Sequence, residues 1–248
     1  MLFLHGFMGA AANWQPIAGR LTDGARCLAV DLPGHGSATG RLSDDDYTMD
    51  GAADALAATL DTQDLSRVAV VGYSMGGRLA LYFALQWPER CRRLLLESAS
   101  PGLETETARA DRRRTDAERA RRISGDFRAF LEDWYRMPLF ASLSRHGLVE
   151  EAVARRLDND PAELVRSLEG MGTGRQPSLW PRLPELAMPA LVLTGALDEK
   201  YCRLTEAMAA RSKGRLRRTV VEDAGHNVHA ERPERFAARL RAFLGEDS

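Results

Sequence analysis

Short apolar runs alternate with longer segments of helical periodicity along most of the 248-residue chain. The apolar runs, rich in leucine and β-branched residues, predict strands over residues 1–4, 26–30, 67–71, 93–97, 190–194 and 216–221. Apolar positions three and four residues apart predict helices over residues 13–21, 49–61, 75–86, 204–211 and 233–243. Alternation of this kind is typical of βα units, so the pattern predicts an α/β fold with a mostly parallel sheet and helices on both faces.

Residues 104–184 break this alternation. The segment contains no convincing strand pattern and is helical in periodicity, with many Arg, Ala, Glu and Leu residues. Phe127, Phe130, Leu131 and Trp134 recur at helical spacing, which is more typical of packing within a helical layer than of a ligand site. We therefore expect a single domain, residues 1–248, with an inserted helical lid at about 104–184.

A serine motif lies where the third predicted strand ends and the next helix begins. Residues 72–76 read Gly-Tyr-Ser-Met-Gly, which fits G-x-S-x-G, and Gly77 follows. In this strand–turn–helix context the motif indicates the nucleophile elbow of an α/β-hydrolase fold, because the tight turn needs small residues around an exposed serine. A serine that only caps a helix needs no glycine on both sides. We therefore interpret Ser74 as the catalytic serine.

Chain order selects the base among five histidines. In this fold the order is serine, acid, histidine, and the histidine lies in a loop after the last strand. His226 follows the strand predicted at 216–221 and comes directly after Gly225. His229 is the nearest rival, which we expect to support the site from the same loop.

The acid is expected after the strand at 190–194. Asp198 occupies that position, and Glu199 and Asp223 are weaker candidates. An aspartate in such a loop is often only a helix cap, so this interpretation stays open beside the catalytic one. The backbone N–H groups of Phe7 and Met75 are the expected oxyanion hole.

The other three histidines have weaker assignments. His5 belongs to the loop after the first strand, close to the expected oxyanion donor. His35 lies in the Pro-Gly-rich stretch 31–36 and is interpreted as part of a tight structural loop. His146 falls in the predicted lid outside any motif, and we expect it to be exposed.

The bulk composition narrows the partners. Acidic and basic residues nearly cancel, with a formal net charge of −1, so no overall positive field favours nucleic acid or an anionic membrane surface. Neither a membrane-spanning apolar run nor a signal-type leader is recognisable. Cys27, Cys91 and Cys202 form neither a C-x-x-C motif nor a metal-ligand cluster, which indicates a reducing, cytoplasmic setting without a bound metal. The oligomeric state is not determined by the sequence, and a monomer is compatible with it.

Further motifs give the chain a narrower resemblance. They are residues 72–78 (GYSMGGR), 100–103 (SPGL), 134–135 (WY) with 138–140 (PLF), 172–174 (GTG) with 176–180 (QPSLW), and 225–229 (GHNVH). Together these closely resemble the 2-succinyl-6-hydroxy-2,4-cyclohexadiene-1-carboxylate (SHCHC) synthase family of menaquinone biosynthesis. The similarity extends over nearly the whole chain, and the lid motifs and Arg78 make it specific, whereas the triad motifs alone are shared by many hydrolases.

The resemblance implies a lyase without a cofactor. Members of the family eliminate pyruvate from an enolpyruvyl precursor that carries several carboxylates, so the implied partner is a small polycarboxylate. Ser74, assisted by His226 and Asp198, would remove a proton next to the succinyl ketone instead of attacking a carbonyl. The implied oxyanion donors, at Phe7 and Met75, would stabilise the developing charge.

The resemblance also implies the substrate-binding residues. Arginine suits carboxylates because its planar fork can form paired hydrogen bonds. Arg78 lies one helical turn after Ser74, and two lid arginines, Arg112 and Arg156, are carried over from the family. Arg109, Arg113 and Arg114 crowd the first lid position, Arg155 adjoins the second, and the segment 109–122 is richer in arginine than the family pattern. Tyr73 and Trp134 resemble family residues that line the pocket.

Two other functions remain open at this stage. One is a carboxylesterase or C–C bond hydrolase that forms an acyl-serine. The arginine-rich pocket disfavours apolar esters, because buried cations are costly without carboxylate partners. The other is a ligand receptor that keeps the fold but not the catalysis, which an intact triad disfavours.

Overall fold

A six-stranded parallel sheet forms the centre of the computed structural model, which describes residues 1–21, 26–40 and 42–245. Its strands overlap all six predicted ones: β1 (Leu2–Leu4), β2 (Leu28–Val30), β3 (Val68–Tyr73), β4 (Cys91–Glu97), β5 (Ala190–Gly195) and β6 (Leu216–Val221). Their order is β2-β1-β3-β4-β5-β6, and every neighbouring pair is parallel. The predicted α/β class is confirmed.

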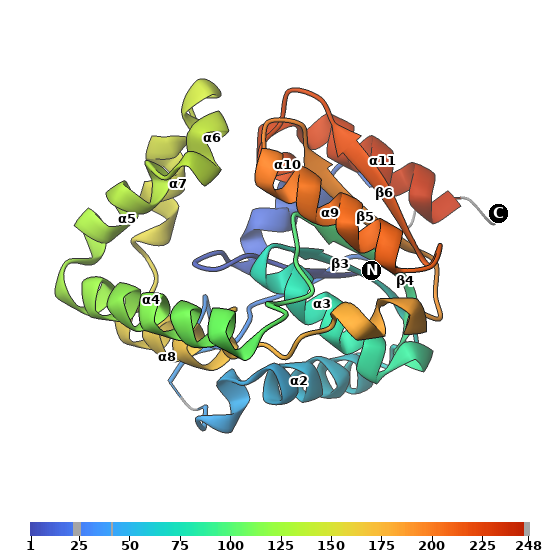
Figure 1. Cartoon of the computed structure of the whole chain (residues 1–248), viewed down its shortest axis with the longest axis horizontal. Helices are drawn as coiled ribbons and strands as arrows, with labels where there is room; N and C mark the ends of the chain where they lie inside the picture. Colours follow the sequence, from blue (N-terminus) through green and yellow to red (C-terminus); the bar gives the residue numbers. More distant parts are fainter. Residues whose placement is uncertain (22–25, 41, 246–248) are drawn as a thin grey trace.

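Both faces of the sheet are buried because successive side chains of a strand point to opposite sides. One hydrophobic cluster contains Leu94 and Leu96 of β4, and the other contains Leu95. Helices α2 (Met49–Thr62), α3 (Met75–Gln86) and α9 (Glu199–Arg211) contribute to the first cluster, and α1 (Gln15–Ala18) and α11 (Pro233–Gly245) to the second. Helices therefore cover both faces, as predicted (Figure 1).

Two predicted helices differ from the structure at their ends. The helix expected over 13–21 is a 3-10 turn, Ala11–Trp14, followed by the short α1, which has Pro16 in its first turn. The helix expected from residue 204 begins at Glu199 instead. It starts earlier because the side chain of Asp198 accepts a hydrogen bond from the Tyr201 N–H and caps its first turn.

Residues between β4 and β5 form helices and no strand, as the sequence predicts; this segment is described throughout. These helices are α4 (Glu106–Gly125), α5 (Phe127–Tyr135), α6 (Ala141–Arg145), α7 (Val149–Arg156) and α8 (Pro161–Met171). Figure 1 shows them gathered beside the sheet and its covering helices. They enclose a third hydrophobic cluster, which includes Phe130, Leu131, Leu164 and Leu168 and to which Met8 and the partly buried Phe7 are added from outside the segment.

The strand order places the reactive loops together. From β1 the chain moves outward to β2 and then returns to β3 on the other side of β1. The loops after β1 and β3 therefore leave neighbouring strands in opposite directions and open a crevice at the carboxyl edge, which is where open α/β sheets bind ligands. Phe7 lies in the first of these loops and Ser74 in the second.

The turn from β3 to α3 is strained and closely packed. Ser74 has φ 51° and ψ −107°, a conformation that L-residues rarely adopt. A Cβ atom on Gly72 would lie 2.4 Å from the Gly76 carbonyl oxygen, and one on Gly76 would lie 2.4 Å from the His5 carbonyl oxygen. The serine can be held in this turn because its glycine neighbours let three backbone segments meet.

No helix within residues 1–21, 26–40 and 42–245 is long and apolar enough to cross a membrane.

We predict that Gly72→Ala lowers the free energy of unfolding by about 1–3 kcal/mol, because the new methyl group would meet backbone atoms that cannot move aside. Urea denaturation measures the change. Gly125→Ala at the end of α4 is the matched control, since its Cβ would meet nothing within 4 Å. Equal stability of the wild type and Gly72→Ala would contradict the packing argument.

Candidate active site

Ser74, His226 and Asp198 form a hydrogen-bonded chain, although they come from three separate loops. The His226 Nδ1 atom lies 2.8 Å from Asp198 Oδ2, and Nε2 lies 3.2 Å from Ser74 Oγ. A carboxylate only accepts hydrogen bonds, so the proton resides on Nδ1 and Nε2 is left to accept from the serine hydroxyl. The arrangement can therefore take a proton through Ser74 onto His226, the chemistry of a serine triad.

Asp198 combines the two roles that the sequence left open. Its Oδ1 atom caps α9 by accepting from the Tyr201 N–H at 3.0 Å, and its Oδ2 atom accepts from His226. The cap fixes the carboxylate, which in turn fixes the orientation of the imidazole. Of the weaker candidates, Glu199 ion-pairs with Arg203, and Asp223 pairs with Arg232 at the surface. Neither is hydrogen bonded to His226.

The two predicted oxyanion donors border the same cavity as Ser74. Phe7 and Met75 both line it, and within the described residues neither backbone amide donates a hydrogen bond to another protein group. Main-chain donors of this kind can stabilise a negative oxygen next to the serine. That these two amides act as oxyanion donors stays a prediction.

Two buried histidines support the loop that carries Phe7. The His35 Nε2 atom accepts from the Met8 N–H at 3.0 Å, and the His5 Nε2 atom accepts from the Leu32 N–H at 3.0 Å. Burial lowers the pKa of His5 to about 4 and, together with the nearby His5, that of His35 to about 3. Both rings are therefore neutral acceptors at neutral pH, which fits a structural role rather than that of a base.

His229 forms a second buried pair behind the triad. Its Nδ1 atom lies 2.7 Å from Glu97 Oε2, its backbone N–H donates to Glu97 Oε1, and its ring stacks on Trp14 with the centroids 4.3 Å apart. As expected, it supports the loop of His226 from below. The ring of Tyr73 contacts the rings of both His229 and His226 and so joins this pair to the triad.

A buried carboxylate holds the His226 loop on both sides. Glu231 accepts from the Gly225 N–H at 2.8 Å and from the Asn227 N–H at 3.2 Å. It also accepts from the Ser142 hydroxyl of α6 at 3.0 Å, and the His146 Nε2 atom lies 3.6 Å away. The expectation that His146 is exposed was wrong, because it packs against this group and its side chain is only 12% exposed. The loop of the base is thus tied to the inserted helices.

A cavity of about 570 Å³ opens above Ser74. Apolar and aromatic side chains line part of it, among them Phe7, Trp134 and Phe140. Its charged lining is mostly cationic, with five such side chains against the carboxylates of Asp198 and Glu199; the cations are Arg78, Arg112, Arg119, Lys200 and Arg203. The local charge favours an anionic ligand, although the whole chain is nearly neutral.

Arg78 contributes a buried positive charge to this cavity. Its Nη1 atom donates to two neutral acceptors, the Met171 carbonyl at 2.8 Å and the Gln176 side-chain oxygen at 3.0 Å. Burial and, to a lesser extent, the neighbouring Arg112 lower its pKa to about 10. The guanidinium still carries its proton at neutral pH, so its charge is available to a carboxylate ligand.

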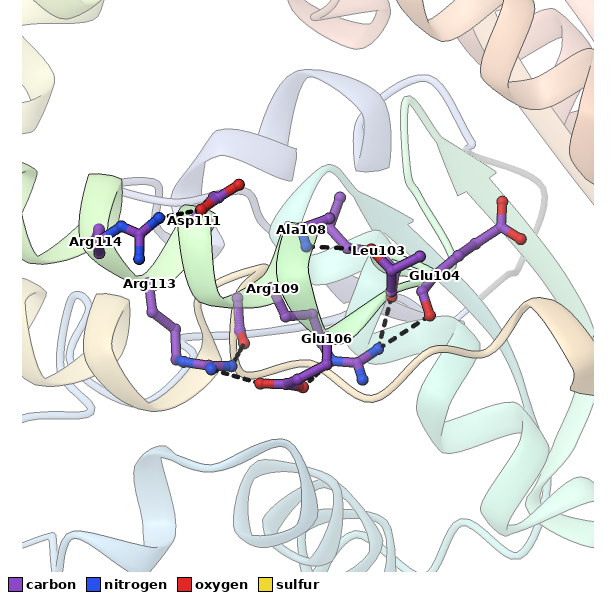
Figure 2. A network of polar contacts seen from close by, with 10 residues as sticks. Leu103, Glu104, Glu106, Ala108, Arg109, Asp111, Arg113 and Arg114 are labelled. Carbon is purple, nitrogen blue, oxygen red and sulfur yellow. Dashed lines mark hydrogen bonds and ion pairs between the residues drawn. The ribbon is translucent and has the colours of Figure 1, made fainter.

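The arginines that crowd Arg112 are engaged elsewhere. Figure 2 shows Arg109 and Arg113 both pairing with Glu106, while Arg109 also donates to the Leu103 carbonyl. Arg114 pairs with Asp111 on the exposed side of α4. Arg112 lines the cavity, as the family resemblance implies, and its neighbours do not.

Two of the predicted substrate-binding residues lie outside the cavity lining. Tyr73 ends β3 and points away from Ser74, so that its ring contacts His226 and His229. Arg156 is on α7 near the ring of Tyr135 and borders two smaller hollows instead. In this structure these two residues are not brought to the site: the Tyr73 ring packs against the two histidines, and no residue of α7 lines the cavity.

Sequence reasoning missed several residues that the structure brings to the cavity. Tyr201 packs against the His226 ring with the centroids 4.6 Å apart, and Arg119 and Lys200 add two cations. Tyr201 could have been found from its place three residues after Asp198, at the first turn of a helix. Arg119 had no signal of its own within a segment of many arginines.

The described residues contain no group of three or more His, Cys, Asp or Glu side chains able to hold a metal ion.

The fold and the hydrogen-bonded Ser–His–Asp chain define the class of protein. Residues 1–233 match the family model described as alpha/beta hydrolase fold, so the chain belongs to the α/β hydrolases. Among solved structures, an esterase from Thermogutta terrifontis is 28% identical with a TM-score of 0.82, covering 98% of this chain and 88% of that one.

Nearer relatives give the family. The SHCHC synthase of Serratia proteamaculans (strain 568) is 37% identical, over 98% of this chain and 92% of its own length. A protein of Bacillus subtilis (strain 168) provisionally named as the same synthase is 39% identical, over 97% and 88%. The structure of MenH from S. aureus is 32% identical with a TM-score of 0.92, covering 99% and 92%. The chain belongs to the SHCHC synthase family, and this confirms the resemblance seen in the sequence.

We predict that Glu231→Gln slows the labelling of Ser74 by a serine-directed phosphonate about 10-fold or more, because an amide cannot accept from both N–H groups that hold the His226 loop and still accept from Ser142. Mass spectrometry follows the labelling. Ser142→Ala, which removes only the α6 hydrogen bond, is the control and should stay near the wild-type rate. A wild-type labelling rate in Glu231→Gln would refute the positioning role.

Proposed function

We propose that this protein is a lyase that eliminates pyruvate from 2-succinyl-5-enolpyruvyl-6-hydroxy-3-cyclohexene-1-carboxylate to give SHCHC. The observation that carries the proposal is a serine triad opening into a cavity whose charged lining is mostly cationic, in a chain of the SHCHC synthase family. A triad alone would suit many reactions, and the arginines narrow the ligand to a polycarboxylate.

Ser74 acts in this proposal as a base relay rather than as a nucleophile. Its Oγ passes its proton to His226 Nε2 and takes the proton from the carbon next to the succinyl ketone, while Asp198 stabilises the imidazolium. The electron pair left on carbon is delocalised onto the ketone oxygen, where the Phe7 and Met75 amides would stabilise the enolate. As the enolate collapses, a double bond forms between C2 and C3 of the ring, the existing C3–C4 double bond moves to C4–C5, and the bond between C5 and the enolpyruvyl oxygen breaks. The leaving enolpyruvate takes up the proton held by His226 and becomes pyruvate.

The inserted helices act as a lid within a single domain in this proposal. Their Arg112 and the α3 residue Arg78 gather carboxylates of the substrate, which orients the proton to be removed toward Ser74. Trp134 provides an apolar wall for the ring. The reaction needs no cofactor, since the triad supplies the proton transfer. Because the described residues contain no disulfide, a reducing cytoplasm is the proposed setting.

Esterase activity is the main competing function, because the T. terrifontis esterase shares the fold at 28% identity. An ester substrate would use Ser74 to form an acyl-enzyme, which water then cleaves. The excess of cationic side chains in the cavity disfavours apolar esters, since cations that lose water need anionic partners.

We predict pyruvate release from the enolpyruvyl precursor by the wild type, followed with lactate dehydrogenase and NADH. Ser74→Ala should lower kcat by about 1000-fold or more while the protein stays folded, because the hydroxyl that passes the proton is removed. A p-nitrophenyl ester is the parallel substrate. Ester hydrolysis without pyruvate release would overturn the proposal, and an unchanged rate in Ser74→Ala would exclude both reactions that depend on Ser74. A wild type that turns over neither substrate would favour a receptor.

Arg78→Ala should lower kcat/KM by about 10- to 100-fold, the cost of losing charge-assisted hydrogen bonds to a carboxylate. Its melting temperature should change little, because the guanidinium is buried against neutral acceptors and gains no ion pair within the described residues. Arg114→Ala, on the exposed side of α4, is the control. Unchanged kinetics in Arg78→Ala would remove this arginine from the substrate site.

A further inference from the structure

Two arginines on the inner face of α4 share one carboxylate. The Arg112 Nε atom donates to Asp116 Oδ1 at 2.7 Å, and the Arg119 Nη1 atom donates to the same oxygen at 3.0 Å. The residues are spaced four and three positions apart, so their side chains lie on the same face of the helix. Asp116 is only 4% exposed, which leaves it fixed between the two guanidinium groups.

The charges of this trio do not cancel. Asp116 supplies one negative charge to two guanidinium groups, so the three side chains together carry an excess positive charge at the cavity wall. Arg78, which also lines the cavity, adds a further cation held by neutral acceptors. Excess positive charge in a partly buried site is unfavourable until an anion enters, so the wall is built to receive one.

Arg119 is held in place rather than left to the solvent. Its guanidinium carbon lies 5.2 Å from the centroid of the Trp134 ring, and both residues line the cavity. The side chain is 24% exposed, and within the described residues its one hydrogen bond uses a single N–H group of the fork. An arginine stacked on an aromatic ring with free donors is well suited to bind a carboxylate.

We infer that Arg119 contacts substrate and determines specificity by binding, together with Arg112, a carboxylate of the substrate at the α4 wall. Asp116 orients the two guanidinium groups, and the ring of Trp134 supports that of Arg119. The inference rests on the proposed function and extends it. The precursor carries three carboxylates, and Arg119 is a cavity cation that the family resemblance did not assign. Arg119 therefore adds to the affinity for a polycarboxylate and selects against analogues that lack one carboxylate.

The test compares Arg119→Ala with the wild type in the pyruvate assay. We expect KM to rise about 10-fold or more while kcat stays within about threefold, because a carboxylate contact remote from the proton transfer changes binding more than chemistry. Arg119→Lys should recover only part of the loss, since it keeps the charge but not the fork. Arg114→Ala, from the exposed side of the same helix, should leave both constants unchanged.

Thermal denaturation separates this role from a structural one. If Arg119 only stabilises α4 through Asp116, Arg119→Ala will melt at a lower temperature and keep the wild-type KM, which would overturn the inference. A rise in KM with a melting temperature near that of the wild type supports it. The rate of pyruvate release by the wild type tests the proposed function, whereas the comparison of Arg119→Ala with the wild type tests the inference. Either can therefore fail without the other.

A binding measurement decides the inference even if the wild type releases no pyruvate. Succinate, a simple dicarboxylate, is titrated against the wild type and Arg119→Ala by isothermal calorimetry at low salt. Weaker succinate binding by Arg119→Ala supports a carboxylate site at Arg119. Equal heats and affinities for the two proteins, including the case in which neither binds, would overturn it.

Discussion

The sharp turn between β3 and α3 is the constraint on which the site depends. Ser74 is held at a positive φ angle because Gly72 and Gly76 allow the backbone of β1, β3 and α3 to approach within van der Waals contact. The two hydrophobic clusters bury both faces of the sheet and hold the strands in this close approach. The strain at one residue is therefore supported by the packing of the whole sheet, as expected where local strain serves a function.

Electrostatics then decides what the strained serine can act on. Asp198 and His226 are buried and joined by a 2.8 Å hydrogen bond, and Asp198 is itself fixed by capping α9. The cations of the cavity come partly from the helices that the triad residues begin, α3 with Arg78 and α9 with Lys200 and Arg203, and partly from α4 with Arg112 and Arg119. In the proposed function, proton transfer and ligand recognition therefore share two helices, and only the α4 arginines come from a part of the chain that carries no triad residue.

The sequence predicted the six strands and selected Ser74, Asp198 and His226, the residues that the structure joins by hydrogen bonds. Both predictions were possible because hydrophobic periodicity and the order of serine, acid and histidine can be read directly from the sequence. It also selected Arg78 and Arg112 for the cavity. It could not separate the cavity arginines from the other arginines of α4, since only the packing of α8 and Asp116 decides which guanidinium turns inward. Tyr73 and Arg156 were misplaced for the same reason: the direction of a side chain depends on neighbours distant in sequence.

The inserted helices enclose an apolar cluster of their own, to which Met8 and the partly buried Phe7 are added from outside the segment. Other apolar residues of the same segment, among them Met171, Leu179 and Leu183, belong instead to the core that covers the sheet. Divergence of the ligand cavity and maintenance of the scaffold are therefore separable only in part: substitutions in the first group change the wall above Ser74, whereas substitutions in the second also change the packing of the sheet.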